Sequence, residues 1–325
     1  MLPRPSQSVA AAALAAVVLS AASAQADRSS LPPEIGYHYG EAEDARVGAL
    51  AGAVSATGNG ITSVFQNPAG LAATPVYHIG ALAAIWPEAR RQSYGAAAMD
   101  SVTSRLALGV GFMWNDQDPD GLKRRGQDLR LAAAYPFSDK VSFGLTGRYL
   151  KLRQNGLGPL GYSYASGGRS GQPVVDSFSF DAGLRIAPTG NFSLGLVGTN
   201  LSNPGNGFQP TTFGGGIGVG NENLVFEADA LADFTTWRKT TSRAMGGFEY
   251  LAADRFPLRL GYVFDSGADS HALSGGLGYI DTQFSFEFGL RRIVSGEQAT
   301  TVLFTLQYFV ESSGATRSPA PMGDF

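Results

Sequence analysis

The chain of 325 residues contains no cysteine and only three histidines. Without cysteine it can form no disulfide bond, has no reactive thiol and cannot build a cysteine-ligated zinc site. His38, His78 and His271 stand apart, and none has a second histidine or cysteine at ligand spacing. We therefore expect no metal and no cofactor.

Motifs for nucleophilic catalysis are also missing. Ser270 and Ser274 flank His271, but no third orienting group accompanies them. We interpret His271 as a loop histidine and expect no catalytic residue. The glycine-rich runs 214–220 and 275–278 lack the Gly-Lys-Ser/Thr of a phosphate-binding loop, and we expect them to lie in strands of the wall.

Charged residues are scarce. They make up 16% of the sequence, against about 25% in soluble domains. The formal net charge is -3 and no basic block occurs, so nothing favours a nucleic-acid partner. Glycine, with 43 residues, is well above its usual share of about 7%. Few charges and many glycines argue against a helical protein.

Long apolar runs are confined to the beginning of the chain. Arg4 precedes an Ala/Val/Leu-rich run at 9–19, and Ala24-Gln25-Ala26 follows as a small-x-small cleavage signal. This core is shorter than the roughly 20 residues that a spanning helix needs. We interpret residues 1–26 as a secretory signal peptide rather than a membrane anchor. The remainder is either soluble and secreted or a barrel.

What the sequence does contain is an alternating pattern that starts at Thr74. Apolar side chains recur at every second position, as in Phe284, Phe286 and Phe288, and turn residues separate the segments. This is the period of a β-strand, and an even number of strands lets an antiparallel barrel close. About fourteen segments are predicted, at 75–86, 92–100, 104–115, 127–136, 140–153, 174–187, 191–201, 210–220, 223–232, 241–250, 256–265, 270–279, 282–292 and 299–310.

The composition of the two strand faces favours a membrane barrel over a soluble sandwich. In a sandwich the apolar face points inward and the polar face meets water. In a membrane barrel the large apolar residues, here including Phe284, Phe286 and Phe288, face lipid. The opposite face is mostly small, with acids and bases that can pair across strands. The charges that we expect to face the lumen are Arg148, Asp181, Arg185, Glu227, Asp229, Arg243, Glu249, Arg259, Glu287 and Arg291.

Connections and aromatic residues agree with this interpretation. Tight connections alternate with longer ones, as do the periplasmic turns and external loops of outer-membrane barrels. The tight ones are 137–140, 188–191, 220–223 and 280–282, and the longer ones are 116–126, 154–173, 202–209 and 233–240. The residues that suit the interfacial aromatic belts are Trp114, Tyr135, Tyr250, Tyr262, Tyr279 and Tyr308.

We therefore predict an all-β protein, a transmembrane antiparallel β-barrel of about fourteen strands with a short N-terminal hatch segment. Residues 1–26 are the signal peptide, 27–73 the hatch, 74–310 the barrel and 311–325 a flexible C-terminal tail. The expected location is the outer membrane of a Gram-negative-type envelope, in contact with its lipid.

The hatch segment does not alternate like a strand. Residues 45–56 are small and could be helical, and Gly58-Asn59-Gly60 would end such a helix. The segment either hangs in the periplasm or folds into the lumen, and we favour the lumen. The turn Asn67, Pro68, Ala69 and Gly70 is interpreted as the hinge from the hatch into the wall.

The same region carries a family resemblance. Residues 45–54, ARVGALAGAV, followed by 64–72, VFQNPAGLA, resemble the N-terminal signature of FadL/PorV-type outer-membrane proteins. In that signature a small-residue segment and an acidic pair precede an N-P-A-G-L turn that leads into a fourteen-stranded barrel. The acidic pair falls here on Asn59 and Gly60, so its role does not carry over.

The resemblance implies a passive channel for hydrophobic small molecules. The alternative is a PorV-like adaptor that transports nothing and binds envelope proteins for secretion or surface attachment; the compact loops modestly favour it. A barrel enzyme is the least supported hypothesis, because no triad is present. The apolar connection 157–164 predicts either a docking patch for cargo or a partner, or a loop folded over the mouth.

Overall fold

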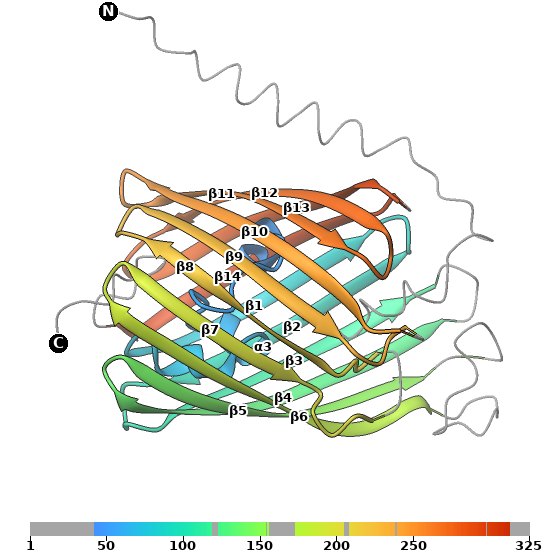
Figure 1. Cartoon of the computed structure of the whole chain (residues 1–325), viewed down its shortest axis with the longest axis horizontal. Helices are drawn as coiled ribbons and strands as arrows, with labels where there is room; N and C mark the ends of the chain where they lie inside the picture. Colours follow the sequence, from blue (N-terminus) through green and yellow to red (C-terminus); the bar gives the residue numbers. More distant parts are fainter. Residues whose placement is uncertain are drawn as a thin grey trace, which may run out of the picture.

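The computed structural model describes residues 42–118, 123–153, 155, 173–204, 208–237, 239–296 and 298–312. They form one closed antiparallel barrel in which strands adjacent in sequence pair and β1 pairs with β14 (Figure 1). The strands are β1 (Val76–Trp86), β2 (Arg91–Asp100), β3 (Ala107–Gln117), β4 (Arg124–Ser138), β5 (Val141–Arg153), β6 (Pro173–Thr189), β7 (Phe192–Thr199), β8 (Thr212–Gly220), β9 (Leu224–Asp233), β10 (Thr241–Ala252), β11 (Phe256–Asp265), β12 (Ser270–Ile280), β13 (Phe284–Ser295) and β14 (Thr300–Ser312). The predicted fold class is confirmed.

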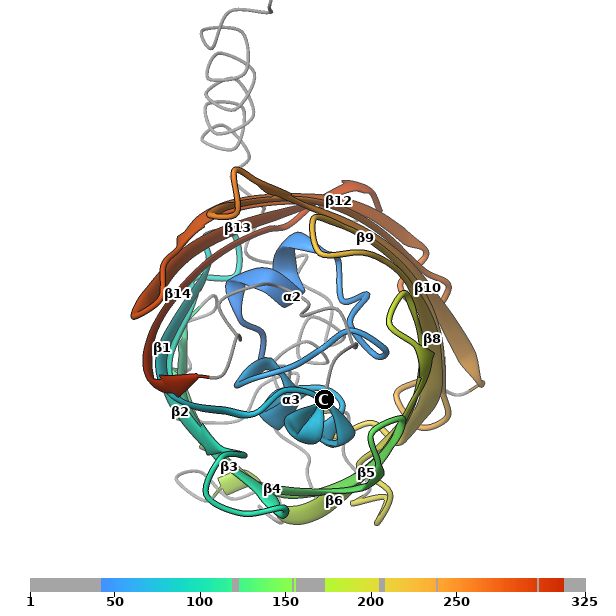
Figure 2. The ribbon, with the colours of Figure 1, turned by 90° about the vertical axis from the view of Figure 1, so that its left-hand side faces the viewer.

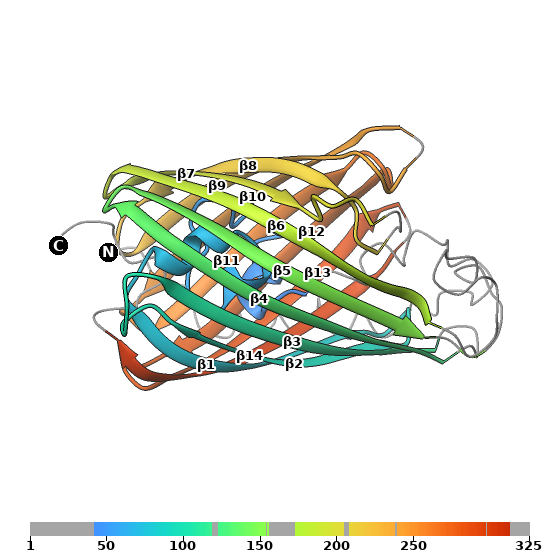
Figure 3. The same ribbon diagram turned by 90° about the horizontal axis from the view of Figure 1, so that it is seen from below.

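The two rims of the barrel differ in their connections. One rim, which we call the turn end, is where β1 begins and β14 ends, and tight connections such as 139–140, 190–191 and 281–283 lie there. The opposite rim, the loop end, carries the longer connections, including 200–211 between β7 and β8. The strands run obliquely between the rims, as Figure 3 shows from below. This is the asymmetry predicted from the connection lengths.

No helix among the described residues is long and apolar enough to cross a membrane.

The outside of the wall is apolar around its whole circumference. Large side chains such as Leu131, Phe178, Leu260, Phe286 and Leu306 are exposed, whereas the alternate positions of each strand face inward and are buried. A belt of exposed apolar side chains of this extent faces lipid, because a soluble protein rarely exposes contiguous apolar patches this large. The chain is an outer-membrane β-barrel.

Aromatic side chains mark the two edges of the apolar belt. Near the loop end Tyr94 lies opposite Trp114, and Tyr149 lies opposite Phe178. Near the turn end Phe284 lies opposite Tyr308. These rows have the positions of the interfacial girdles of outer-membrane barrels.

A charge placed in the lipid-facing row should destabilise the barrel. Phe286 is 47% exposed on the outside of β13. We expect Phe286→Arg to lower the free energy of unfolding by about 2 kcal/mol or more; arginine at the bilayer midplane costs about 2–4 kcal/mol. Folding titrations in liposomes measure this cost. Phe137→Arg, at the turn end of β4, is the control and should cost about 0–1 kcal/mol; equal costs would contradict the assignment of depth.

The inside of the barrel holds the hatch, residues 42–73 of the described chain. It contains three short helical elements, α2 (Ala45–Ala49), α3 (Thr62–Phe65) and the 3-10 helix η3 (Pro68–Ala72). Viewed along the barrel axis, α2 and α3 lie within the ring of strands (Figure 2). Nearly every residue from 42 to 73 is buried.

Several boundaries differ from the prediction. The helix expected over 45–56 ends at Ala49, because the N–H groups of 54–57 donate to acidic side chains of the wall instead of to a helix. Strand β14 continues to Ser312, which pairs with Val76, two residues past the predicted end of the barrel at 310. Four predicted or unassigned segments lie outside the described residues: the predicted signal peptide at 1–26, residues 27–41, the connection 157–164 and residues 313–325.

Candidate functional site

The hatch reaches several sides of the wall from within. Helix α2 packs on β11, β12, β13 and β14, whereas α3 and η3 pack on β3, β4, β5 and β6. Between them the chain passes so close to β7 that only glycine fits in the wall: a Cβ at Gly195 would lie 2.7 Å from Ala56 N and nearer still to Ser55 O. Wall and hatch are therefore complementary in shape.

Two acidic residues of β9 hold the middle of the hatch. Glu227 and Asp229 point inward at alternate positions of the strand. They accept four backbone hydrogen bonds: Val54 N and Ser55 N donate to Asp229 Oδ2 at 3.1 and 2.9 Å, and Ala56 N and Thr57 N donate to Glu227 at 2.6 and 3.2 Å. On β6, Arg185 Nε donates to Ala56 O at 3.0 Å. The wall thus supplies the partners that a helix would otherwise provide.

A second set of charges holds α2. Arg46 Nε lies 3.2 Å from Glu249 Oε2, and both side chains are buried. Arg259, also buried, forms ion pairs with Glu249 and Glu287. Each cation therefore has at least one direct acidic partner, which is what makes buried charges tolerable inside a wall.

The start of α2 has a local cap. Asp44 is the N-cap residue, and its Oδ1 accepts from Val47 N at 2.8 Å. Burial raises the pKa of Asp44, although the hydrogen bonds from Thr62 and Val47 oppose that shift. The Thr62 Oγ1 hydrogen bond to Asp44 also ties α3 to α2.

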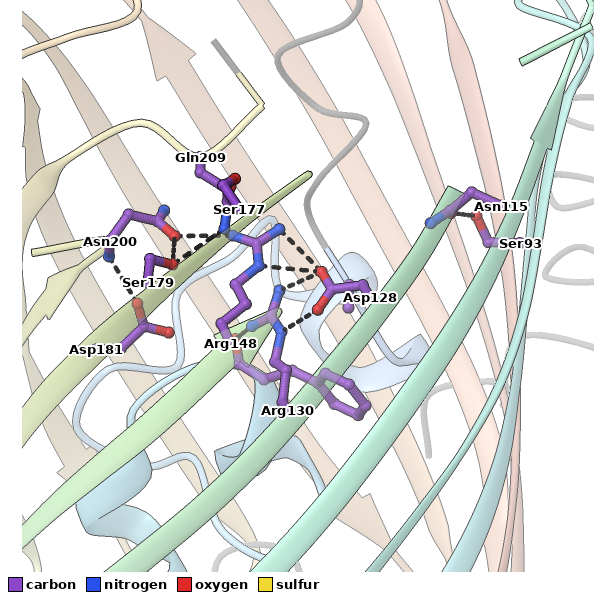
Figure 4. A network of polar contacts seen from close by, with 12 residues as sticks. Ser93, Asn115, Asp128, Arg130, Arg148, Ser177, Ser179, Asp181, Asn200 and Gln209 are labelled. Carbon is purple, nitrogen blue, oxygen red and sulfur yellow. Dashed lines mark hydrogen bonds and ion pairs between the residues drawn. The ribbon is translucent and has the colours of Figure 1, made fainter. Parts of the chain in front are cut away.

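Closer to the loop end, a polar network joins β4, β5, β6 and the β7–β8 connection (Figure 4). Asp128 is its centre: Arg130 Nε and Nη2 donate at 3.1 and 3.2 Å, and Arg148 Nε and Nη2 donate at 3.1 and 2.9 Å. Arg148 Nη1 donates to Asn200 Oδ1 at 3.2 Å, and Asn200 N donates to Asp181 Oδ1 at 2.6 Å. We call this the mouth network. Its remaining members are Ser177, Ser179 and Gln209.

The mouth network also contacts the hatch. Arg130 Nη1 donates to Phe65 O, the last residue of α3, at 2.6 Å. The Arg130 guanidinium carbon lies 5.4 Å from the centroid of the Phe65 ring, within cation–π range. Arg130 therefore bonds both to the hatch, at Phe65, and to Asp128 of the mouth network.

An apolar cluster lies beyond the mouth network toward the loop end. It consists of Leu150, Leu152, Val175 and Phe208, all buried, and we call it the mouth cluster. Along the inner face of β5 the order is Leu152 and Leu150, then Arg148, then Ser142, whose Oγ donates to Ala69 O of the hatch at 2.9 Å. The inner wall thus changes from apolar to charged to hatch-bound along one strand.

Comparison with known proteins shows which solved structures share this architecture. No protein-family model and no curated protein matches the sequence. Solved structures do match. The fold is that of the FadL-type barrels. The Ralstonia pickettii toluene transporter TbuX aligns with a TM-score of 0.63 at 14% identity, covering 83% of this chain and 99% of that chain. The CymD monoaromatic hydrocarbon channel aligns with a TM-score of 0.60 at 16% identity, covering 83% of this chain and 97% of that chain. A Pseudomonas aeruginosa FadL homologue aligns with a TM-score of 0.57 at 14% identity, covering 82% of this chain and 98% of that chain.

The structure places the sequence-predicted charges on the inner face of the barrel, in separate groups. Arg148 and Asp181 join the mouth network, and Arg185, Glu227 and Asp229 hold the middle of the hatch. Glu249 pairs with Arg46 of α2, and Arg259 pairs with Glu249 and Glu287. The other two lie nearer the loop end: Arg243 Nε is 3.5 Å from Asp265, and Arg291 Nη1 is 2.8 Å from Glu43 of the hatch.

Sequence reasoning missed the centre of the mouth network. Asp128 and Arg130 lie in a predicted strand, and they alternate with Leu129 and Leu131, which face outward. That alternation was sufficient to place both inside the barrel. The hatch charges Glu43, Asp44 and Arg46 were missed for another reason: they lie outside the strands, where no alternation indicates which way a side chain points.

Two histidines, His78 and His271, lie in strands of the wall. His78 lies on β1, buried on the inner side with its ring stacked on Phe309 at 5.6 Å between centroids. His271 lies on β12, and its Nδ1 is 2.6 Å from the Tyr262 hydroxyl. The interpretation of His271 as a loop histidine was therefore wrong. Among the described residues no group of three or more possible metal ligands occurs.

The hatch turn caps η3 and contacts the wall. Asn67 caps η3 by accepting from Ala69 N at 3.1 Å, with Pro68 as the first helical residue. Its Nδ2 donates to Ser55 O at 2.7 Å and points to Leu184 O and Leu196 O in the wall. The turn therefore anchors the hatch to β6 and β7, and the chain enters β1 only after η3. Pro68, Ala69 and Gly70 of the turn are part of η3, which ends at Ala72 shortly before β1 begins at Val76. The role of this turn as a hinge stays a prediction.

Loss of that anchor should loosen the hatch without opening the barrel. Replacing Asn67 with Ala and Pro68 with Gly removes the cap, worth about 1 kcal/mol, and leaves Ser55 O without its donor, at about 1–3 kcal/mol. The strand ladders do not pass through this turn. Ion conductance should therefore rise while heat-modifiable gel migration stays that of a closed barrel.

The control is Asn59→Ala, another asparagine of the hatch, which should leave conductance unchanged. Equal conductance for all three proteins would contradict the assigned anchor role of Asn67.

Proposed function

We propose that the chain is an outer-membrane channel through which small hydrophobic molecules cross passively. Solved structures with this fold include a toluene transporter and a monoaromatic hydrocarbon channel. Entry is driven by partitioning from water into an apolar site, so no chemical step and no catalytic residue is required.

The observation that carries the proposal is the mouth cluster. Leu150, Leu152 and Val175 occupy inward positions at the loop end, where a water-filled pore would present polar groups. Phe208, from the β7–β8 connection, lies in the same cluster and is 8% exposed. The mouth cluster lies at the entrance of a charged lumen, where a hydrophobic molecule can pass from water into an apolar environment.

The pairing of the lumen charges argues for uncharged cargo. Arg130 and Arg148 share Asp128, and Arg259 is paired with both Glu249 and Glu287. A carboxylate cargo would have to compete with these buried acids for the same cations, at a large desolvation cost. An aromatic or aliphatic hydrocarbon has no such cost.

One observation favours the adaptor alternative. Several loop-end connections are short, namely 87–90, 266–269 and 296–299, which leaves little external surface for an elaborate ligand site. In an adaptor the barrel would present its rim to envelope proteins and transport nothing.

Uptake into proteoliposomes separates the two functions. We expect saturable uptake of radiolabelled toluene by vesicles that contain the protein, above the rate for empty vesicles, and no saturable uptake of octanoate. Absence of saturable uptake for both compounds, together with co-purification of envelope proteins, would support the adaptor.

The role of the mouth cluster is tested in the same assay. Replacing Leu150 and Leu152 with Ser removes apolar burial worth about 1.5–3 kcal/mol for each side chain, and the concentration for half-maximal uptake should rise at least about tenfold. Phe178→Leu, on the lipid-facing side of β6, is the control. Equal half-maximal concentrations for the double variant and the control would contradict entry through the cluster.

A further inference from the structure

Three cations lie together on the outside of the barrel at the loop end. Arg125 on β4 and Lys151 and Arg153 on β5 occupy outward positions of their strands. The Arg125 side chain is 62% exposed and that of Lys151 28%. The wall below them faces lipid, so these cations lie at the edge of the membrane.

Their height relative to the membrane follows from the strand register. Trp114 and Tyr149 belong to the aromatic row of the loop end. Asp116 and Lys151 lie one outward position nearer the loop end on the same two strands. Because aromatic girdles sit at the boundary between lipid tails and headgroups, the charged row lies at the depth of the headgroups.

Two of the cations face each other directly. In the β4–β5 ladder Arg125 is the partner of Arg153. Directly opposed like charges on one face of a sheet are destabilising. The arrangement becomes favourable when an anion lies between the two guanidinium groups, which offer a planar fork of donors to a phosphate.

The acids nearby are already engaged. Asp176 accepts the Tyr149 hydroxyl at 2.6 Å and lies 3.3 Å from Lys151 Nζ. Asp116 lies 3.8 Å from Arg125 Nε, a long contact. Among the described residues Arg153 has a Coulombic interaction with Asp176 but no salt bridge of its own. Cations therefore exceed acids in this row, and the excess lies at the Arg125–Arg153 pair.

We propose that Arg125 and Arg153, with Lys151 beside them, bind the phosphate of a lipid headgroup in the outer leaflet. The headgroup phosphate lies between the two guanidinium groups, and the acyl chains lie on the apolar wall below, along Leu129 and Tyr149. This site is separate from the lumen, so lipid binding there does not depend on the proposed transport function.

The test is lipid retention, measured by native mass spectrometry of the protein released from phosphatidylcholine nanodiscs doped with diphosphoryl lipid A. The wild type should retain lipid A, and retention should decrease as salt is raised, because exposed charges are screened. Replacing Arg125 and Arg153 with Gln should weaken retention at least about tenfold, since each basic residue near an anionic surface contributes about 1 kcal/mol.

The matched control removes two exposed arginines from the turn end. Arg105→Gln with Arg255→Gln changes the net charge equally, and these residues lie beside Tyr135 and Tyr279. The control should retain lipid A like the wild type, and lysine at both 125 and 153 should restore part of the retention. Heat-modifiable migration verifies that every variant has folded.

Three results would overturn the proposal. The first is equal retention by the glutamine variant and the wild type. The second is equal retention of lipid A from which the phosphates have been removed. The third is complete displacement by inorganic phosphate at millimolar concentration, which would identify a site for free phosphate instead of a lipid headgroup.

Discussion

Replacing Asp128 with asparagine should lower the free energy of unfolding by about 3–5 kcal/mol, the cost of removing one partner from a buried ion pair. The carboxylate accepts four hydrogen bonds from Arg130 and Arg148 and is 1% exposed. Asparagine has nearly the same shape but lacks the charge. Denaturant titration in liposomes, followed by the gel shift between folded and unfolded barrel, measures the loss.

Two further variants make this result specific. Asp116→Asn, on the outer rim, removes an exposed carboxylate with one long contact to Arg125, and it should change stability by no more than about 1 kcal/mol. Adding Arg148→Gln to Asp128→Asn should recover part of the loss, because fewer uncompensated charges remain. A stability loss at Asp128 no larger than that at Asp116 would mean that the mouth network is a solvated rim.

The strands of the barrel could be predicted from the sequence because one face of each strand meets lipid. The alternation in Phe284, Phe286 and Phe288 has a period of two, and in a barrel every strand obeys it. Strand ends were less certain, since an end depends on the partner strand. Ser312, for example, remains in β14 because Val76 is opposite it.

The hatch could be placed in the lumen from its composition, but its conformation could not be predicted. Small residues over 45–56 have helical propensity, yet the side chains of Glu227 and Asp229 bind the backbone there. Those carboxylates are 170 to 175 residues away in sequence. Local propensity carries no information about such a partner, so tertiary contacts decided where α2 ends.

For the candidate site, the sequence likewise predicted which residues face the lumen but not which partners they contact. Alternation placed Arg148 and Asp181 inside the barrel, but nothing in the sequence indicated that Asn200, which follows β7, would join them. Asn67 shows the same limit. Its capping role follows from the Asn-Pro pair, whereas its contact with Ser55 O depends on the path of the hatch across the lumen.

A valine at Gly195 should displace the hatch. A Cβ there would meet the backbone of Ser55 and Ala56, and backbone cannot move aside as the end of a long side chain can. Overpacking of this kind costs about 1–3 kcal/mol, which shifts the balance between seated and displaced hatch by about 5- to 150-fold. Conductance through single barrels should rise accordingly.

Gly246 provides the matched control. It is also a strand glycine, on β10, and a Cβ added there has no atom within 4 Å. Gly246→Val therefore changes strand propensity in the same way without touching the hatch, and its conductance should equal that of the wild type. A rise in both variants would indicate a general loosening of the wall, and a rise in neither would mean that the hatch is not what limits passage. Only a rise confined to Gly195→Val assigns the block to the 54–57 segment, the part of the hatch bound by Glu227 and Asp229.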